Sequence, residues 1–289
     1  MNDRIVRGTA ANHQIRVFAM SSRELVEVAR MAHETTAVVT AAMGRVLTAA
    51  AMMGVMMKNE NDLLTIQIRS EGPIKGITAT ADAFGRVKGY THVTEVELPL
   101  NESGKLDVGT AVGPGVMHVT KDLGLKEPYV GQIDLQTGEI AEDLTYYFAT
   151  SEQTPSAVGL GVLVNRDQSV KQAGGFIIQL MPDVEEETIT KLEEKIASMR
   201  SVTELLEEGM TPEEILEELL GDFGLEISET IPAQFYCNCS KERVSHAIAS
   251  INREELDQMI EENEPIEVKC QFCNGAYDFS VEDLKEIVK

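Results

Sequence analysis

Four cysteines in the last quarter of the chain are the residues whose types and spacing most clearly predict chemistry. Cys237 and Cys239 are separated by one residue, and Cys270 and Cys273 follow about thirty residues later, separated by two. Two close pairs of thiolates supply a tetrahedral ligand set for zinc, with Zn–S distances of about 2.3 Å. We therefore expect these four sulfurs to bind one Zn²⁺. His246 lies between the pairs, but four sulfurs already fill a zinc shell, so it is expected to be an ordinary helix residue.

The spacing alone leaves three main uses for the thiols open, and four independent buried cysteines are less favoured than any of these. Of the three, structural disulfides are the least favoured, because the sequence suggests a cytoplasmic protein and disulfides are rare in that compartment. A constitutive structural zinc site is the second use. The third is a redox-responsive site, in which one sulfur is oxidised to sulfenic acid and condenses with a close thiol, so that zinc loses its ligands. The tight Cys-x-Cys spacing favours this third use.

The segment that carries the cysteines begins at about Ile231 and has fewer than 60 residues. A unit of this size rarely folds on its hydrophobic core alone and usually needs disulfides or a bound metal ion. Between the pairs, the sequence predicts helices over 240–251 and 253–262. Binding of structural zinc is worth about 10–16 kcal/mol, which is enough to fold so small a unit. We therefore predict a zinc-binding domain over residues 231–289.

The net charge of −23 is concentrated in the middle of the chain. Residues 183–230 contain 16 acidic and 3 basic residues, whereas residues 1–182 have a net charge of only −4. The middle segment also has apolar residues at spacings of three and four, which predict two or three short amphipathic helices. Such helices are marginal without a partner. We therefore interpret residues 183–230 as an acidic helical linker with one apolar face, formed by Ile189, Leu192, Ile196, Ile215 and Leu219.

Residues 1–182 have a mixed pattern of helices and strands. Helices are expected from about 22 to 34, from about 37 to 58 and over 139–151, and strands over 15–19, 63–70, 74–93 and 116–120, with a closing hairpin formed by SAVGLGVLVN and GGFIIQLMP. The apolar stretch 37–57 is long enough to span a membrane. Because Arg45 lies inside it, we interpret it as a buried helix instead. The predicted class is α+β, with a mixed first domain, a helical acidic linker and a small zinc-binding domain.

Composition and motifs also exclude several function classes. The excess of acidic residues argues against nucleic acid and against anionic membranes as partners. The first twenty residues do not read as a secretory signal, so the cytoplasm is the default location. No phosphate-binding loop and no nucleophile elbow are found, so the sequence does not point to an enzyme.

The cysteine pattern and its surroundings resemble the redox-regulated 33-kilodalton heat-shock chaperone of bacteria, the heat-shock protein 33 family. The flanks FYCNCSKERV and KCQFCNGAYDFS carry the resemblance. It extends through NDLLTIQIRSEGPIKG, EPYVGQIDLQTGEIAEDLTYYFATSEQTPS and AGGFIIQLMP, so it covers essentially the whole chain. The acidic middle segment matches by composition and position only.

The resemblance implies an ATP-independent holdase that is inactive when reduced and zinc-bound. It implies that oxidant together with heat or unfolding stress forms the disulfides Cys237–Cys239 and Cys270–Cys273. Zinc then leaves, the C-terminal domain unfolds, the linker loosens, and the protein dimerises and binds unfolded client proteins. In this scheme residues 1–182 form the substrate-binding and dimerisation domain. The alternative is a constitutive zinc-knob binding or scaffold protein.

The residues themselves suggest how the linker takes part. We expect its apolar face to cover an apolar face of the first domain. Loss of zinc would then remove the linker's support and expose a large apolar patch, which is what a holdase needs. The high negative charge would keep the protein soluble while this patch is exposed.

Overall fold

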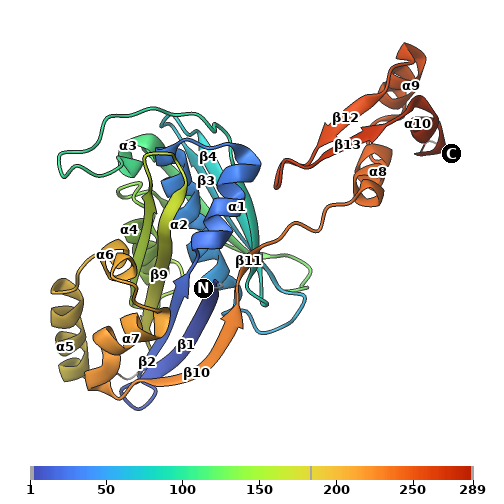
Figure 1. The fold of residues 1–289 in the computed structure, drawn as a ribbon. Helices are drawn as coiled ribbons and strands as arrows, with labels where there is room; N and C mark the ends of the chain where they lie inside the picture. The colour runs from blue at the N-terminus through green and yellow to red at the C-terminus, as the bar shows by residue number, and fades with distance from the viewer. Residues whose placement is uncertain (1–2, 183, 288–289) are drawn as a thin grey trace. The chain divides into compact units, whose positions relative to one another are not determined.

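The computed structural model describes residues 3–182 and 184–287, and the chain divides into two compact units after Phe235. The first unit contains two sheets with helices, and the second is a small unit of helices and one hairpin (Figure 1). The predicted α+β class is confirmed. Residues 1–2, 183 and 288–289 belong to the predicted domain ranges but lie outside the described residues.

The first sheet of the larger unit is antiparallel throughout. Its strand order is β10-β1-β2-β9-β8, so β10 and β8 are its two edges. The strands are β10 (Glu226–Pro232), β1 (Arg4–Ala10), β2 (Ile15–Ser21), β9 (Val170–Leu180) and β8 (Ser156–Val164).

The second sheet has the strand order β11-β5-β4-β3-β6-β7. Every neighbouring pair is antiparallel except β11 with β5. The strands are β11 (Gln234–Phe235), β5 (Arg86–Thr91), β4 (Gly76–Asp82), β3 (Leu63–Ser70), β6 (Gly115–Asp122) and β7 (Tyr129–Asp134).

The apolar helix α2 (Ala37–Gly54) is the centre of the first unit. It contacts strands of both sheets, and nearly all of its side chains are buried. Among the described residues, α2 is the one helix long and apolar enough to cross a membrane, but its burial identifies it as a core helix. Arg45 reaches the edge of this core, where it pairs with Glu139 and donates to its backbone carbonyl. The interpretation of this stretch as a buried helix agrees with this packing up to Gly54, where α2 ends a few residues earlier than predicted.

Three other helices pack in the first unit, the first two of them against α2 and the third against β7 and β8. They are α1 (Arg23–His33), α3 (Val108–Val112) and α4 (Ala141–Thr150). The turn before α4 is organised by the buried carboxylate of Asp143, which accepts hydrogen bonds from the backbone N–H groups of Gln136, Thr137 and Ile140 at 2.6–3.0 Å. A carboxylate at a helix N-terminus is also favoured by the helix dipole.

The acidic segment packs on the face of the first sheet opposite α2. It forms α5 (Glu186–Ala197), α6 (Val202–Glu207), α7 (Pro212–Leu220) and a 3-10 turn η1 (Gly221–Phe223). Thr211 starts α7 with a capping box, and Ser201 starts α6 in the same way. The apolar sides of the helices cover strand residues that include Val17, Phe176 and Ile178.

The predicted apolar face of the linker is buried in three of its five positions. Leu192, Ile215 and Leu219 belong to the cluster with the strands, and the half-buried Ile196 packs against that cluster. Ile189 is half-buried and lies outside it. The sequence analysis missed the contribution of α6, which supplies Val202, Leu205 and Leu206.

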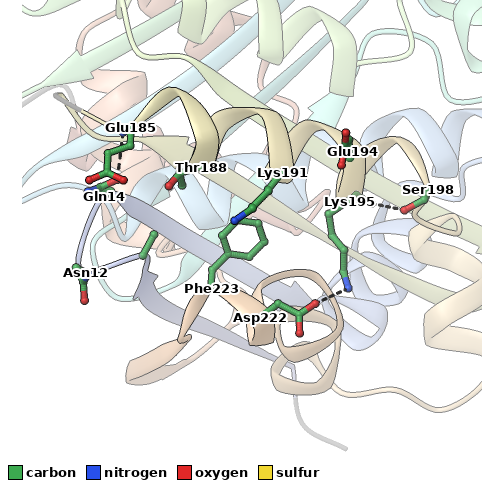
Figure 2. Close-up of a pocket in the computed structure, with 11 residues that line it drawn as sticks. Asn12, Gln14, Glu185, Thr188, Lys191, Glu194, Lys195, Ser198, Asp222 and Phe223 are labelled. Atoms are coloured by element: carbon green, nitrogen blue, oxygen red, sulfur yellow. Dashed lines mark hydrogen bonds and ion pairs between the residues drawn. The ribbon is translucent and has the colours of Figure 1, made fainter.

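The helix α5 is the most loosely attached part of this cover. Its one fully buried side chain is Leu192. A groove of about 560 Å³ separates α5 from the β1–β2 turn and from Phe223 (Figure 2). The polar links across it are long: Glu185 N–H donates to Gln14 at 3.3 Å, and Lys195 Nζ lies 3.4 Å from an oxygen of the exposed Asp222. Exposed pairs of this kind contribute little stability.

The boundary of the cysteine-bearing unit lies five residues later than the sequence analysis placed it. Residues 231–235 belong to the first unit because β10 pairs with β1 and β11 pairs with β5. The strand β10 has the sequence EISETIP and is mostly exposed, so it lacks the apolar alternation that would reveal it.

A bidentate ion pair joins the first sheet to the acidic helices. Arg4 of β1 contacts both carboxylate oxygens of Glu213 of α7, at 2.7–2.9 Å.

A buried carboxyl at the start of the fold leads to a pH prediction. Asp3 accepts a hydrogen bond from Leu25 N–H at 2.6 Å, and its own carbonyl accepts one from Ala233 N–H. Burial is the largest influence and raises the pKa of Asp3 from 3.8 to about 6. Because the folded state holds this proton more tightly than the unfolded chain, the contribution of Asp3 to stability is present below pH 4 and is lost as the pH rises through 6.

Asp3→Asn should therefore gain stability relative to wild type between pH 4 and pH 7. The expected gain is about 2–3 kcal/mol, since one pKa unit corresponds to about 1.4 kcal/mol. Urea unfolding followed by circular dichroism at several pH values measures it. Asp222→Asn, at an exposed position, serves as the control. Parallel stability curves for Asp3→Asn and wild type would contradict the prediction.

Candidate metal centre

Two short loops of the second unit present the four cysteines. Cys237 and Cys239 lie in the irregular segment just before α8 (Lys241–Ala249), which begins at the N-cap Ser240. Cys270 and Cys273 lie in the turn between β12 (Ile266–Lys269) and β13 (Ala276–Phe279). The remaining helices of the unit are α9 (Arg253–Glu262) and α10 (Val281–Ile287).

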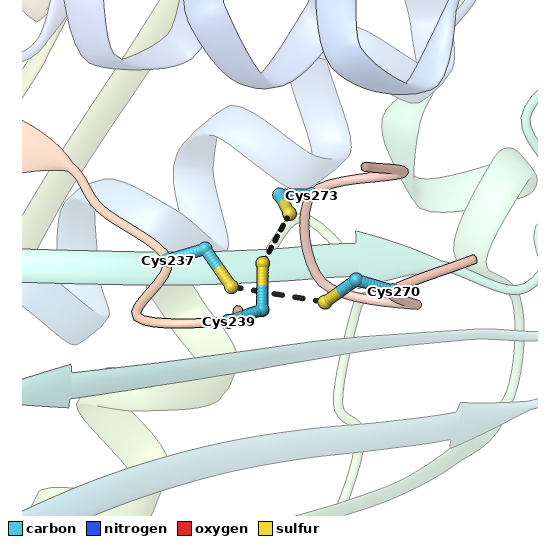
Figure 3. Close-up of side chains that lie close together, drawn as sticks. All are labelled: Cys237, Cys239, Cys270 and Cys273. Carbon is cyan, nitrogen blue, oxygen red and sulfur yellow. Dashed lines mark hydrogen bonds between the residues drawn. The ribbon is translucent and has the colours of Figure 1, made fainter. Parts of the chain in front are cut away.

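The hairpin turn is shaped so that both of its sulfurs point the same way. Cys270 N–H donates to the carbonyl of Gly275 at 2.9 Å, and Asn274 N–H donates to the carbonyl of Cys270 at 2.7 Å. Asn274 has a φ of +56°, a left-handed conformation that asparagine tolerates better than most residues. The backbone therefore curls around Cys273 and directs it toward the first pair (Figure 3).

The four sulfur atoms form a single compact group. All lie within 4.8 Å of one another. Cys237 Sγ is 3.7 Å from Cys270 Sγ, and Cys239 Sγ is 3.2 Å from Cys273 Sγ. In a tetrahedron with Zn–S bonds of about 2.3 Å, the sulfurs are separated by about 3.8 Å. The residues therefore fit a tetrahedral metal ion, and a four-thiolate set is typical of structural zinc.

The shortest sulfur contacts join the two pairs rather than the members of one pair. Figure 3 shows Cys237 facing Cys270 and Cys239 facing Cys273. All four residues are free cysteines and are half-buried. Partial exposure matters because an oxidant must reach a thiolate before it can react with it.

Tyr277 is a contributor that the sequence analysis missed. Its hydroxyl donates a hydrogen bond to Cys239 Sγ at 3.0 Å. Burial opposes ionisation of Cys239, but the hydrogen bonds from Tyr277 and the neighbouring thiols outweigh it and lower its pKa to about 7. Burial instead raises the pKa of Cys237 and of Cys273. Tyr277 follows Cys273 by four residues, on the strand leaving the hairpin, but this spacing alone does not place its hydroxyl beside Cys239.

The hydrophobic core of this unit is very small. Four fully buried side chains form it: Ile248, Leu256, Phe279 and Leu284. A core of this size does not hold a unit of about 50 residues together without a further crosslink such as a bound metal ion. The sulfur group lies in loops that join the helices and strands of this unit, so a bound metal would crosslink them. His246 is not a member of the sulfur group.

The fold and the site together define a class of protein: an α+β unit whose sheet is covered by acidic helices, followed by a small unit with a four-cysteine metal-type site. The model of the Hsp33 protein family matches residues 3–280. The chain belongs to this family.

Individual relatives cover the full length of the chain. The 33 kDa chaperonin of Lachnoclostridium phytofermentans is 64% identical over 288 residues, covering 100% of this chain and 99% of the relative. The 33 kDa chaperonin of Agathobacter rectalis is 61% identical over 287 residues, covering 99% of this chain and 100% of the relative. The crystal structure of the 33 kDa chaperonin (heat shock protein 33 homolog) from Thermotoga maritima is similar with a TM-score of 0.92 and 39% identity, covering 99% of this chain and 98% of that one.

The size of the core predicts that the second unit depends on metal. Removing the metal with a chelator under reducing conditions should abolish hydrogen-exchange protection of amides in α8, α9 and β12–β13. Amides of β3 and β4, in the larger unit, should keep theirs. Mass spectrometry of exchanged peptides measures both. Cys273→Ser should bind less than one zinc per chain and show the same loss without chelator, whereas Ser245→Ala should behave like wild type. Unchanged protection after chelation would mean that the unit folds without metal.

Proposed function

We propose that this Hsp33-family chaperone is a redox-regulated, ATP-independent holdase that binds unfolding proteins under oxidative and heat stress. The observation that carries the proposal is the set of four partly exposed sulfurs within 4.8 Å, in a unit whose core has four fully buried residues. Such a unit is stable only while its ligands are thiolates. Its folding is therefore sensitive to oxidants.

The chemical step requires a peroxide as oxidant. One thiolate attacks the peroxide and becomes a sulfenic acid, and the peroxide releases one oxygen as water or hydroxide. A second thiol then displaces the hydroxyl group, which forms a disulfide and a second water. Each disulfide thus uses one peroxide and removes two ligands. Formation of Cys237–Cys239 and Cys270–Cys273 would leave no thiolate for the Zn²⁺, which would be released.

Release of zinc would act on the acidic helices through the continuity of the chain. Phe235, the last residue of β11, is separated from Cys237 by one residue. The strands β11 and β10 lead back from there to α7 and the other covering helices. These helices repel one another, because residues 183–230 have a net charge of −13. In our proposal, unfolding of the cysteine unit destabilises this cover and exposes the apolar face of the first sheet.

The exposed face would serve as the binding surface for clients. It includes Val6, Val17, Ala19, Phe176 and Ile178, which the acidic helices bury in the structure described here. A contiguous apolar surface of this kind binds unfolded chains without specificity for sequence. The proposal includes a cytoplasmic location and dimerisation on activation, with residues 1–182 contributing the substrate-binding and dimer-forming surface. Binding of this kind needs neither catalysis nor nucleotide.

Oxidation provides the direct test. Treatment of the zinc-bound protein with peroxide at raised temperature should release one zinc per chain, read with a chromogenic chelator, and should then suppress aggregation of a denatured client without ATP. Peptide mapping should find disulfides between residues 237 and 239 and between 270 and 273. Mapping that found Cys237–Cys270 and Cys239–Cys273, the closest contacts in the structure, would contradict the pairing. Retained zinc with unchanged aggregation would favour a constitutive zinc-knob binding or scaffold protein.

The role of the covering helices is tested by a substitution far from the cysteines. Leu219 of α7 is 1% exposed and packs against the sheet. Leu219→Ala should destabilise the packing of the acidic helices on the sheet by about 2–5 kcal/mol, the usual cost of truncating a buried leucine. The variant should suppress client aggregation at a lower peroxide dose or temperature than wild type. Glu193→Ala, at an exposed position of α5, should not. Equal activation thresholds for Leu219→Ala and wild type would separate the helices from the switch.

A further inference from the structure

A cleft in the first unit lies beside the free edge of β8. It has a volume of about 740 Å³. Residues of α2 form its floor, the loop 96–106 forms one wall, and residues 160–166 form the other. The start of α6, at Ser201–Thr203, closes one side. All of its lining residues belong to the first unit, and one of them, Val202, also packs in the cluster between the acidic helices and the sheet.

The β8 wall of the cleft carries backbone groups that the sheet does not use. Val158 N–H donates to Thr145 Oγ1 of α4, so the backbone N–H and C=O groups of Val158 point away from β9. Because successive residues of a strand alternate in direction, those of Leu160 and Val162 point the same way. Within the described part of the chain, β8 pairs with β9 alone. Leu160 and Val162 thus offer two N–H donors and two carbonyl acceptors to a strand lying in the cleft.

This edge lacks the features that usually prevent pairing with another chain. Edge strands are normally protected by charged residues, proline or a covering element. The opposite edge of the same sheet, β10, carries two glutamates and Pro232. The nine residues of β8, SAVGLGVLV, contain neither a charge nor a proline. α4 covers the edge at Val158 but leaves it open beside the cleft.

The two faces of an added strand would meet different surroundings. Val162 and Leu160 belong to or pack on the core around α2, so alternate side chains of an added strand would extend toward Ala37 and Val38 on the floor. Gly161 faces Thr203 of α6, where an added Cβ would lie 2.6 Å from the Thr203 methyl carbon. The other side chains would therefore extend toward α6.

The charges of the cleft indicate what kind of strand fits. Lys105 and Arg166 line it, and no described carboxylate lies within 4.0 Å of either side-chain cation. Arg45 is also present but is paired with Glu139. Glu97 is the acidic residue among those lining the cleft. Glu204, just outside the lining, also interacts electrostatically with Lys105. Among the residues that line the cleft there is still an excess of positive charge. It favours a segment that carries carboxylates.

We propose that this cleft binds an extended segment of an unfolded protein, with apolar side chains at alternate positions and an acidic side chain beside them, as an added strand on the edge of β8. This mode uses backbone hydrogen bonds for affinity and therefore accepts many sequences. The inference rests on the proposed function, since it assigns one binding site to the client. It also gives α6 a second role, because release of α6 would free one side of the cleft.

A labelled peptide tests the proposal on the full-length protein. The probe is an eight-residue peptide of alternating valine and threonine with a glutamate at each end, and its binding is followed by fluorescence anisotropy before and after peroxide treatment. We expect saturable binding that is tightened by the treatment. The same peptide with N-methylated backbone nitrogens at alternate positions should bind at least tenfold more weakly. Equal binding of the two peptides would overturn the proposal.

Two variants separate the edge from the charges. Val162→Pro removes one outward N–H, while the bonds to β9 are made by its neighbours, so peptide affinity should fall at least tenfold. The double variant Lys105→Glu with Arg166→Glu, whose positions are on the surface, should lower the affinity for the glutamate peptide at least fivefold. It should raise the affinity for a peptide with lysine at each end. Lys126→Glu, on an exposed loop outside the cleft, should change neither. Unchanged affinities in the double variant would also overturn the proposal.

Further outcomes distinguish the cleft from the chaperone activity itself. If Val162→Pro loses peptide binding yet suppresses client aggregation as well as wild type after oxidation, the cleft is not a client site and the proposed function stands. If the variant changes the oligomeric state, measured by light scattering, without changing peptide affinity, the edge pairs with a second copy of the chain. Either result overturns the proposal. Failure of wild type to suppress aggregation would count against the proposed function instead.

Discussion

Four sulfur atoms within 4.8 Å of one another form a group that is stable as thiolates only around a cation. The rest of the second unit would depend on a cation bound there, because its own core of four buried side chains is small for its helices and hairpin. A metal bound at this site would thus compensate for the weak core. With a larger core the unit would stay folded without a metal, and the chemical state of the sulfurs would then have no structural consequence.

The first sheet has two faces with covers of different kinds. On one face lies α2, an 18-residue apolar helix that is buried between two sheets. On the other face lie short helices with many carboxylates, held by a stripe of leucine and isoleucine side chains and, at α5, by little more than Leu192. The difference follows from composition. The apolar helix is stable only within a core, whereas the charged faces of the acidic helices are well solvated by water.

Much of this arrangement could be predicted from the sequence, where the signal is local. The cysteine pairs, the core helix that begins at residue 37 and most of the linker's apolar face all depend on residues close together in the chain. Other features depend on long-range pairing. The strand β10 carries no apolar alternation because it is an exposed edge, and only its partner β1 reveals it. In the same way, the bond from Tyr277 to Cys239 is made by the fold rather than by spacing.

The acidic helices are attached to one sheet at both of their ends. The chain enters them from β9 and leaves them through β10, and both strands belong to the sheet that the helices cover. As long as β10 remains paired with β1, detached helices form a closed loop whose ends stay in place. Their return is then an intramolecular reaction with a high effective concentration and a modest loop-closure entropy. If clients bind the uncovered face as proposed, the cover would compete with them at a rate independent of protein concentration, and the tether would limit how long the face stays open.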